Sequence, residues 1–418
     1  MTSSDPSRDR DDAERAERRS VNGRPGNRRS TEPGTSDRRP TDRRTFLAAV
    51  SAITAGGLAG CTGNGNGGIG NGNGNGNGNG DDSGSDIGQI GSGREGREAP
   101  GGTSMDEMPD LEGELTIYSG RGEFLVGELV NYIDDRYDDF TVADNVRYGN
   151  STDLVNQIIT EGEGTSADVF YSVNAGALGA LADEGQAASL SSDLTEMVRP
   201  EFHTENWIGT SGRARSVPYN TDALSEGDLP TDIMAYPEEF DGDLGWAPRY
   251  GSCQAFVTAM RILEGEEATR EWLQGVLDAG IQEYPDEFAA CEAIADGEID
   301  AGFTNHYYIQ RVLDGSPEAP IATAFTEGDA GAVFNVAGAA VVEGTDDPTL
   351  AENFIRHLLS AEAQDYFATS TFEYPLIPEV EPVGDLPTID ELDVPDIDLT
   401  KLSDLEATVD LMRDVGAL

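Results

Sequence analysis

The sequence predicts an α/β protein whose folded part consists of two lobes with a ligand cleft between them. From about residue 112 onward, short apolar runs of strand length alternate with segments whose apolar residues recur at helical spacing. The alternation resumes after Trp246 and contains too many strands and helices for one compact α/β unit. Two lobes therefore fit the chain, and two unrelated domains in tandem are the alternative.

The first part of the folded chain is predicted to contain three strand–helix pairs. Residues 115–118 form a short apolar run, and residues 124–133 then place apolar side chains at helical spacing. The further strands expected here are 145–148 and 167–171, and the further helices are 152–159 and 175–183. Such alternation is typical of a parallel sheet with helices on both faces.

The second part repeats this alternation. The strands expected here are 281–284, 299–304 and 334–343, and the helices are 254–263, 268–279, 287–296, 350–359 and 361–367. Lobe 1 is predicted over 113–214 and 338–388, and lobe 2 over 215–337 and 389–418. Ligands in such folds lie at the carboxyl ends of strands, where loops and helix N-termini converge.

The charge of the chain indicates a halophilic protein. It carries 79 Asp and Glu residues against 27 Lys and Arg, a net charge of −52, and its one lysine is Lys401. At molar salt the Debye length falls to about 3 Å, so the self-repulsion of such a surface is screened. An acidic disordered protein is the alternative, but 37% hydrophobic residues in periodic runs can build a core. The same charge argues against a nucleic-acid partner.

The first 112 residues resemble export and tether sequences rather than a domain. Arg43 and Arg44 precede an apolar stretch at 48–59, in the manner of a twin-arginine signal, and Cys61 closes a lipobox-like Leu-Ala-Gly-Cys. We expect residues 1–61 to be an N-terminal extension with a lipoprotein signal, although a short buried helix is the alternative. Residues 62–112, rich in Gly, Asn and Ser, are expected to be a disordered tether. The protein should therefore be extracytoplasmic, at the cell surface and lipid-anchored to the membrane.

No enzyme motif is recognisable in the sequence, so we expect no catalytic residues. The turn Ser119-Gly120-Arg121-Gly122 follows a strand and suits an anion. Tyr307 and Tyr308 follow another strand, and neighbouring tyrosines can converge on one point only at a turn or helix start. Phenolate oxygen is a hard donor that matches Fe³⁺, whereas aromatic packing or a sugar cleft are the alternatives. Cys253 and Cys291 could form a disulfide or remain two buried thiols.

Several motifs together resemble the ferric-ion-binding protein family of ABC importers. They are Tyr118-Ser119-Gly120-Arg121-Gly122-Glu123, Asn174-Ala175-Gly176-Ala177-Leu178-Gly179, Gly245-Trp246-Ala247-Pro248-Arg249-Tyr250, Thr304-Asn305-His306-Tyr307-Tyr308 and Gly328-Asp329-Ala330-Gly331. The resemblance extends from about residue 114 to residue 418. It implies the two-lobed periplasmic-binding-protein fold, the "Venus flytrap", with iron in the cleft.

The resemblance also implies the site residues. Tyr250, Tyr307 and Tyr308 would be iron ligands, and Arg121 would hold a synergistic carbonate or bicarbonate on the opposite lobe. Some members of the family also use a first-lobe histidine and carboxylate, but those positions here hold Gly122 or Arg121 and Val173. His306 is expected to pack away from the metal. The implied partner is an ABC transporter permease, and we expect a monomer.

Other functions remain open from the residues alone. The nearest is a binding protein of the same fold for a polyamine, sulfate or phosphonate, although carboxylates and stacked aromatics would suit a polyamine better. A surface protein without a ligand is another alternative, and a secreted hydrolase is a third, although His203 and His357 lie in no recognisable catalytic context.

The charge of the chain makes its stability testable by dilution of salt. We expect the folded body to lose structure as salt falls well below molar, because its carboxylates are then no longer screened. Circular dichroism followed across a salt titration measures this. A spectrum that stays unchanged down to about 0.1 M salt, where the Debye length is about 10 Å, would contradict the halophilic interpretation.

Overall fold

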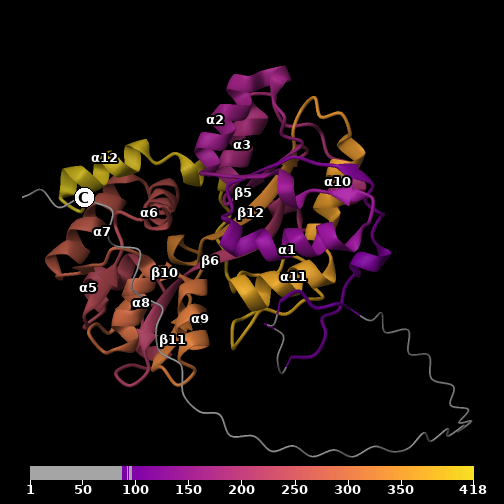
Figure 1. Ribbon diagram of the computed structural model, residues 1–418. Helices are drawn as coiled ribbons and strands as arrows, with labels where there is room; N and C mark the ends of the chain where they lie inside the picture. The colour runs from indigo at the N-terminus through magenta and orange to yellow at the C-terminus, as the bar shows by residue number, and fades with distance from the viewer. Residues whose placement is uncertain (1–86, 92, 94–96) are drawn as a thin grey trace, which may run out of the picture. The chain divides into compact units, whose positions relative to one another are not determined.

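The computed structural model describes residues 87–91, 93 and 97–418, which belong to one compact unit of the chain (Figure 1). Arg43, Arg44 and Cys61 lie outside the described residues, so the predicted export signal remains a prediction. Within the described part of the chain, no helix is both long and apolar enough to cross a membrane. The fold is α/β with two lobes, as the sequence predicts.

A single ten-stranded sheet runs through both lobes. Its strand order is β4-β2-β5-β12-β6-β9-β7-β8, and β10 and β11 also pair with β6. The strands are β2 (Ile117–Ser119), β4 (Val146–Tyr148), β5 (Val169–Ser172), β6 (Ile208–Asn220), β7 (Leu244–Trp246), β8 (Gln282–Glu283), β9 (Ala301–Gly302), β10 (Thr304–Asn305), β11 (Ile321–Ala324) and β12 (Phe334–Val341). A separate pair is formed by β1 (Gly113–Glu114) and β3 (Phe140–Thr141).

The sheet is mixed, whereas the sequence predicted a parallel sheet. Strand β2 pairs in parallel with β4 and β5, and β7 pairs in parallel with β8 and β9. Strand β6, however, is antiparallel to β9, β10, β11 and β12, and β12 is antiparallel to β5. Most of the antiparallel pairs involve β6, a long strand that joins the two halves of the sheet. The antiparallel pairing was missed because β6 was not expected from the sequence.

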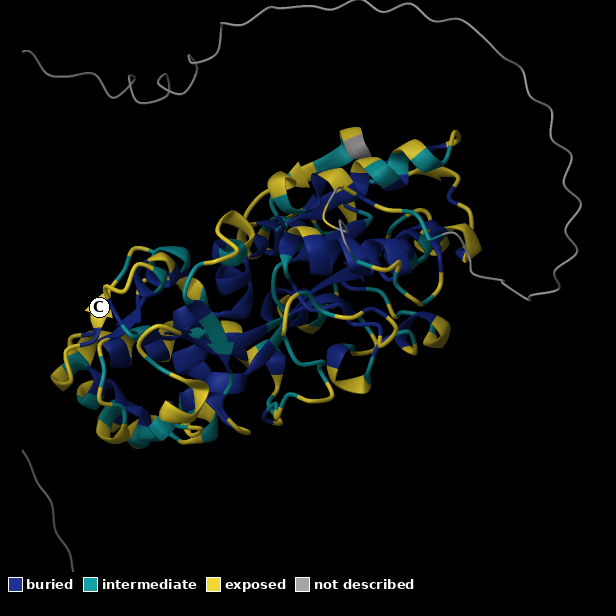
Figure 2. Ribbon diagram, turned by 90° about the horizontal axis from the view of Figure 1, so that it is seen from below, coloured by how far each residue is buried: buried dark blue, intermediate teal, exposed yellow. Residues whose placement is uncertain are grey.

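Helices cover the sheet on both sides of each lobe, and the buried residues lie between these layers (Figure 2). The helices of lobe 1 are α1 (Glu123–Arg136), α2 (Ser151–Glu161), α3 (Ala175–Asp183), α4 (Ser192–Thr195), α10 (Pro348–Leu358) and α11 (Ala361–Tyr366), and those of lobe 2 are α5 (Tyr236–Glu239), α6 (Gly251–Leu263), α7 (Glu266–Asp278), α8 (Glu287–Ala295), α9 (His306–Gly315) and α12 (Glu406–Val415). The helices expected from apolar spacing agree with these bounds to within a few residues.

Shorter helical turns connect these elements. The 3-10 turns are η1 (Met105–Glu107), η2 (Ala143–Asn145), η3 (Gly162–Gly164), η4 (Pro200–Phe202), η5 (Glu226–Asp228), η6 (Ile233–Ala235), η7 (Ala330–Ala332) and η9 (Leu399–Ser403), and η8 (Phe367–Thr371) is a π-helical turn.

The last part of the predicted tether, residues 97–112, belongs to the folded body. The buried carboxylate of Glu362 in α11 accepts hydrogen bonds from the Ser104 hydroxyl at 2.7 Å and from the Met105 backbone at 2.9 Å. Met105 is fully buried, and Leu111 is buried in the same core. These apolar side chains fix the segment, because burying them removes apolar surface from water.

The C-terminal segment touches both lobes. Turn η9 packs against α3 of lobe 1 and against α6 of lobe 2, and α12 then lies on α6 and α7. The contact with α3 is close, since a Cβ added to Gly176 would lie 2.1 Å from the Ser403 hydroxyl oxygen. The lobe boundaries expected near 214 and 337 fall inside β6 and β12, and the register of β12 against β6 shifts between Ala337 and Gly338.

A buried ion pair joins the end of β2 to β6 and to the segment after η8. The Arg121 guanidinium donates to Ser211 at 2.6 Å and to the carboxylate of Glu373 at 2.5 Å. Burial alone would raise the pKa of the Glu373 carboxyl, but the charges of Arg121 and Arg213 more than offset this and lower it. Glu373 is therefore ionised in the folded protein.

We expect Glu373→Gln to destabilise the protein by about 3–5 kcal/mol, because the change leaves the buried charge of Arg121 without its partner. Since folding lowers the pKa of Glu373, its stabilising contribution is complete above the ordinary glutamate pKa of about 4.3 and is lost as pH falls through the folded-state value. Thermal unfolding in molar salt at several pH values measures both effects. Equal unfolding temperatures for variant and parent at neutral pH would contradict this account.

Candidate metal centre

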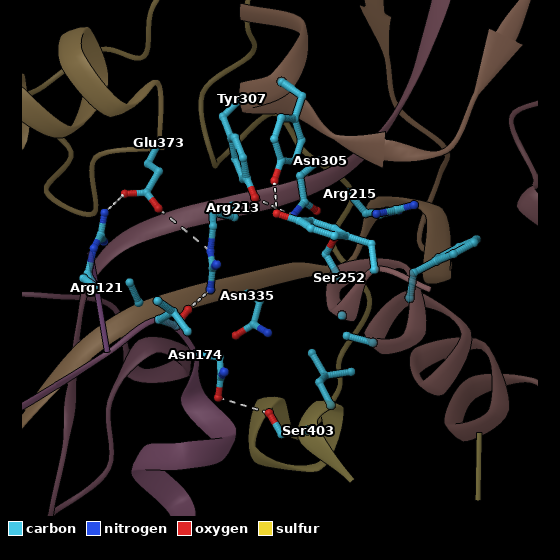
Figure 3. A pocket seen from close by; sticks show the side chains of 18 of the residues that line it. Arg121, Asn174, Arg213, Arg215, Ser252, Asn305, Tyr307, Asn335, Glu373 and Ser403 are labelled. Carbon is cyan, nitrogen blue, oxygen red and sulfur yellow. Dashed lines mark hydrogen bonds and ion pairs between the residues drawn. The ribbon is translucent and has the colours of Figure 1, made fainter. Parts of the chain in front are cut away.

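A cavity of about 560 Å³ lies between the two lobes (Figure 3). Lobe 1 lines it with residues from the N-terminal ends of α1, α2 and α3, and lobe 2 lines it with the first turns of α6 and α9. Strands β6 and β12 form part of its wall, and the C-terminal segment reaches its edge, where the Ser403 hydroxyl donates to Asn174 at 3.1 Å. Residues from many separate parts of the chain therefore face one space.

The three predicted tyrosines meet on the lobe 2 side of this cavity. Helix α9 begins directly after β10, so Tyr307 and Tyr308 occupy its first turn, with ring centroids 4.3 Å apart. Tyr250 is the N-cap residue of α6, and its hydroxyl lies 2.7 Å from the hydroxyl of Tyr308. The Asn305 side-chain amide donates to the Tyr307 hydroxyl at 3.2 Å. Three phenol oxygens thus converge on one region of the cleft.

Burial keeps the tyrosine pair in the neutral form when no cation is bound. Burial raises the pKa of Tyr307 and that of Tyr308, and the neighbouring Tyr307 adds to the rise at Tyr308. The nearby charge of Arg213 opposes this effect at Tyr307. The guanidinium carbon of Arg311 lies 5.1 Å from the ring centroid of Tyr307 and 5.3 Å from that of Tyr308. A bound cation would therefore have to displace the phenol protons.

Arg121 lines the cavity but is engaged by protein groups. Its side chain is 1% exposed, and its two terminal nitrogens contact Ser211 and Glu373. Arg213, which was not among the site residues predicted from the sequence, lies between Glu373 and Tyr307 in Figure 3. Its Nε is 4.0 Å from Glu373, and its Nη2 donates to the carbonyl of Val173. The Arg213 side chain is 17% exposed, so it is more accessible from the cleft than Arg121 is.

The cleft is positively charged in a strongly acidic chain. Among the described residues that line it, four are arginines and one is a carboxylate, and they are Arg121, Arg213, Arg215, Arg311 and Glu373. Arg213 and Arg215 are two positions apart on β6, so their side chains leave the same face of the strand. That spacing is the signal in the sequence that could have identified them. The arrangement suits an anion, or a ligand that brings negative charge.

His306 points away from the tyrosines' hydroxyls into the core. It is fully buried, its Nε2 lies 2.9 Å from the carbonyl oxygen of Phe372, and its ring packs on Tyr374 with a centroid separation of 4.6 Å. Burial lowers the pKa of His306 to about 4, so the ring is neutral at physiological pH. In the described ranges, no group of three or more His, Cys, Asp and Glu side chains is placed to hold a metal ion.

The two cysteines of the folded body are not bonded to each other. Cys253 in α6 and Cys291 in α8 are both free and fully buried. Burial raises the pKa of each thiol to about 12, so neither ionises at neutral pH. Of the two alternatives open from the sequence, the structure has the buried thiols.

Known proteins share this architecture along most of their length. The major ferric iron-binding protein of Neisseria meningitidis serogroup A is 29% identical over 312 residues, which cover 72% of this chain and 93% of the relative. The structure of iron-bound HitA from Pseudomonas aeruginosa matches with a TM-score of 0.64 at 30% identity, over 72% of this chain and 99% of that chain. Apo FutA2 from Synechocystis PCC6803 matches with a TM-score of 0.63 at 25% identity, over 73% and 100% of the two chains.

These similarities confirm the resemblance to ferric iron-binding proteins. Residues 135–391 match the sequence profile of a family described as bacterial extracellular solute-binding proteins, and this range is more than half of the chain. The chain belongs to the bacterial extracellular solute-binding protein family.

Proposed function

We propose that this protein captures ferric iron outside the cytoplasm and delivers it to the permease of an ABC importer. The observation that carries the proposal is the convergence of the Tyr250, Tyr307 and Tyr308 hydroxyls in a cleft whose remaining walls carry arginines. The Neisseria relative is a major ferric iron-binding protein and the HitA structure is iron-bound, which supports the same cargo here. A monomer anchored by lipid at Cys61, after export through Arg43 and Arg44, remains part of this proposal.

Charge balance supports a ferric ion held together with an anion. Three phenolates neutralise Fe³⁺, and a carbonate or bicarbonate would add negative charge that the cleft arginines can balance. An unbalanced charge in a shielded cleft would be costly. We assign direct contact with the anion to Arg213, because its side chain is 17% exposed whereas that of Arg121 is only 1% exposed. Arg121 would then contribute positive charge without touching the anion, and its ion pair would hold Glu373 in place.

A second candidate is a binding protein for an anion alone, such as sulfate or a phosphonate. The four arginines of the cleft favour this candidate over a polyamine, which would be repelled by them. A site for an anion alone, however, would not require three phenol oxygens to converge. Adding sulfate or methylphosphonate without iron, and measuring the unfolding temperature, separates the two candidates.

We expect Tyr307→Phe and Tyr308→Phe to abolish tight iron binding while the lobe stays folded. Each change keeps the aromatic ring and removes a ligand oxygen. Loss of a residue that only hydrogen-bonds to a metal ligand lowers metal affinity roughly 10- to 100-fold. Loss of the ligand oxygen itself should therefore lower iron affinity by more than this. Stability should fall by only about 1 kcal/mol. Visible absorbance after addition of ferric citrate measures the tyrosinate–iron charge-transfer band, and competition with a chelator measures affinity.

Tyr374→Phe is the matched control for these variants. Tyr374 is buried beside His306, and its hydroxyl has no hydrogen-bond partner among the described residues. It should bind iron like the parent protein. Cleft variants that also bind iron like the parent would overturn the proposed ligands.

Iron binding should release about two protons per ion from Tyr307 and Tyr308 at neutral pH, because both phenols are protonated before the metal binds. The direction follows from the raised pKa values of Tyr307 and Tyr308: affinity for iron falls as pH falls, since protons compete with the metal for each phenolate. A pH indicator in weakly buffered solution counts the protons when iron is added, after subtraction of those released by the chelate itself. Release of fewer than about one proton would argue against tyrosinate ligands.

A further inference from the structure

One buried carboxylate lies at the meeting point of three helix starts. Glu287 is the first residue of α8 and is completely buried. Its Oε1 accepts hydrogen bonds from Arg215 at 2.5 Å and from the Ser252 hydroxyl at 2.6 Å. Its Oε2 accepts the backbone N–H of Asn305 at 3.0 Å. The N-terminal ends of helices attract negative charge, and Arg215 supplies a full positive charge beside them.

The groups that Glu287 holds are the immediate neighbours of the tyrosines. Ser252 lies two residues after Tyr250, in the first turn of α6. Asn305 is the N-cap residue of α9, directly before the turn that carries Tyr307 and Tyr308. Glu287 therefore ties the segment of Tyr250 to the segment of the tyrosine pair, although it contacts none of the three phenol oxygens through a described hydrogen bond.

This link does not depend on the protonation of the phenols. The direct hydrogen bond between the hydroxyls of Tyr250 and Tyr308 requires a proton on at least one of them. Once a cation displaces both protons, that bond is lost and the two phenolate oxygens repel each other. The hydrogen bonds of Glu287 to the Ser252 hydroxyl and the Asn305 backbone N–H involve no phenol, so the loss of the phenol protons does not break them.

We propose that Glu287 is a positioning residue that sets the separation between Tyr250 and the pair Tyr307 and Tyr308. By fixing both helix starts to one carboxylate, it determines how closely three oxygens can surround a metal ion. This inference rests on the proposed function, because it assigns a role within that iron site. The competing interpretation is that Glu287 serves only as the buried counter-ion of Arg215.

Ser252→Ala separates these interpretations, because it cuts the link to α6 and leaves the pair of Glu287 and Arg215 intact. The control is Thr258→Val on the same helix, which removes a buried hydroxyl that contacts Thr408 at 2.7 Å and lies away from Glu287. Ser252→Thr keeps the hydroxyl and should restore the parent behaviour. Each protein is loaded with ferric citrate in molar salt, and the visible band and the loss of iron to a chelator are recorded.

We expect Ser252→Ala to bind iron about 10- to 100-fold more weakly than the parent and to shift the maximum of its charge-transfer band. Thr258→Val and Ser252→Thr should match the parent in both measurements. Glu287→Gln should also weaken iron binding. It should in addition lower the unfolding temperature, because it leaves Arg215 without its counter-charge. If Glu287→Gln fails to fold, Ser252→Ala still gives the decisive result.

An unchanged band and affinity in Ser252→Ala would overturn the positioning role while leaving the proposed function intact. Equal losses in Ser252→Ala and Thr258→Val would also overturn it, since any buried hydroxyl of α6 would then have the same effect. A parent protein that shows no charge-transfer band would instead contradict the proposed function itself. The two failures are therefore distinguishable in one set of measurements.

Discussion

The positive charge of the cleft is the constraint on which the account of this site depends. A chain of net charge −52 places four arginines around one cavity, where burial makes each uncompensated charge costly. Glu287 neutralises Arg215, and Glu373 is shared between Arg121 and Arg213, so the cleft keeps a positive surplus on the pair Arg121 and Arg213 and on Arg311. Phenolates and a small anion would balance that surplus. The same surplus would make the empty cleft less stable than the occupied one.

Strand β6 connects the two lobes and contributes residues to the cleft between them. It belongs to both halves of the sheet and carries Ser211, Arg213 and Arg215 along one stretch. Sequence periodicity predicted most helices and several strands, β12 among them, but it missed β7, β11 and the long strand β6. Strand β6 is packed so closely that a Cβ at Gly212 would lie 2.1 Å from the ring of Phe334. A small residue is therefore required at this position. For this reason β6 does not show the run of large apolar residues by which a buried strand is recognised. The antiparallel pairing of the sheet was missed for the same reason.

The tyrosines and the residues that support them differ in how far they could be predicted. Tyr307 and Tyr308 stand together at a strand end, and resemblance to a family suggested Tyr250 and Arg121. Glu287 is one of 79 acidic residues and has no local motif, because its contacts with Ser252 and Asn305 arise only from the packing of separate helices. Arg213 was missed because its approach to the cleft depends on β6. The spacing of Arg213 and Arg215 indicates a shared strand face, but contacts between segments far apart in the chain cannot be identified from a single sequence.

Resonance Raman spectroscopy of the iron-loaded parent protein tests the central claim most directly. Excitation within the visible absorption band enhances vibrations of the groups that exchange charge with the metal. The account predicts enhanced phenolate ring vibrations, which disappear when iron is removed by a chelator. A protein that holds iron without enhanced phenolate vibrations, or that holds no iron in molar salt, would contradict it.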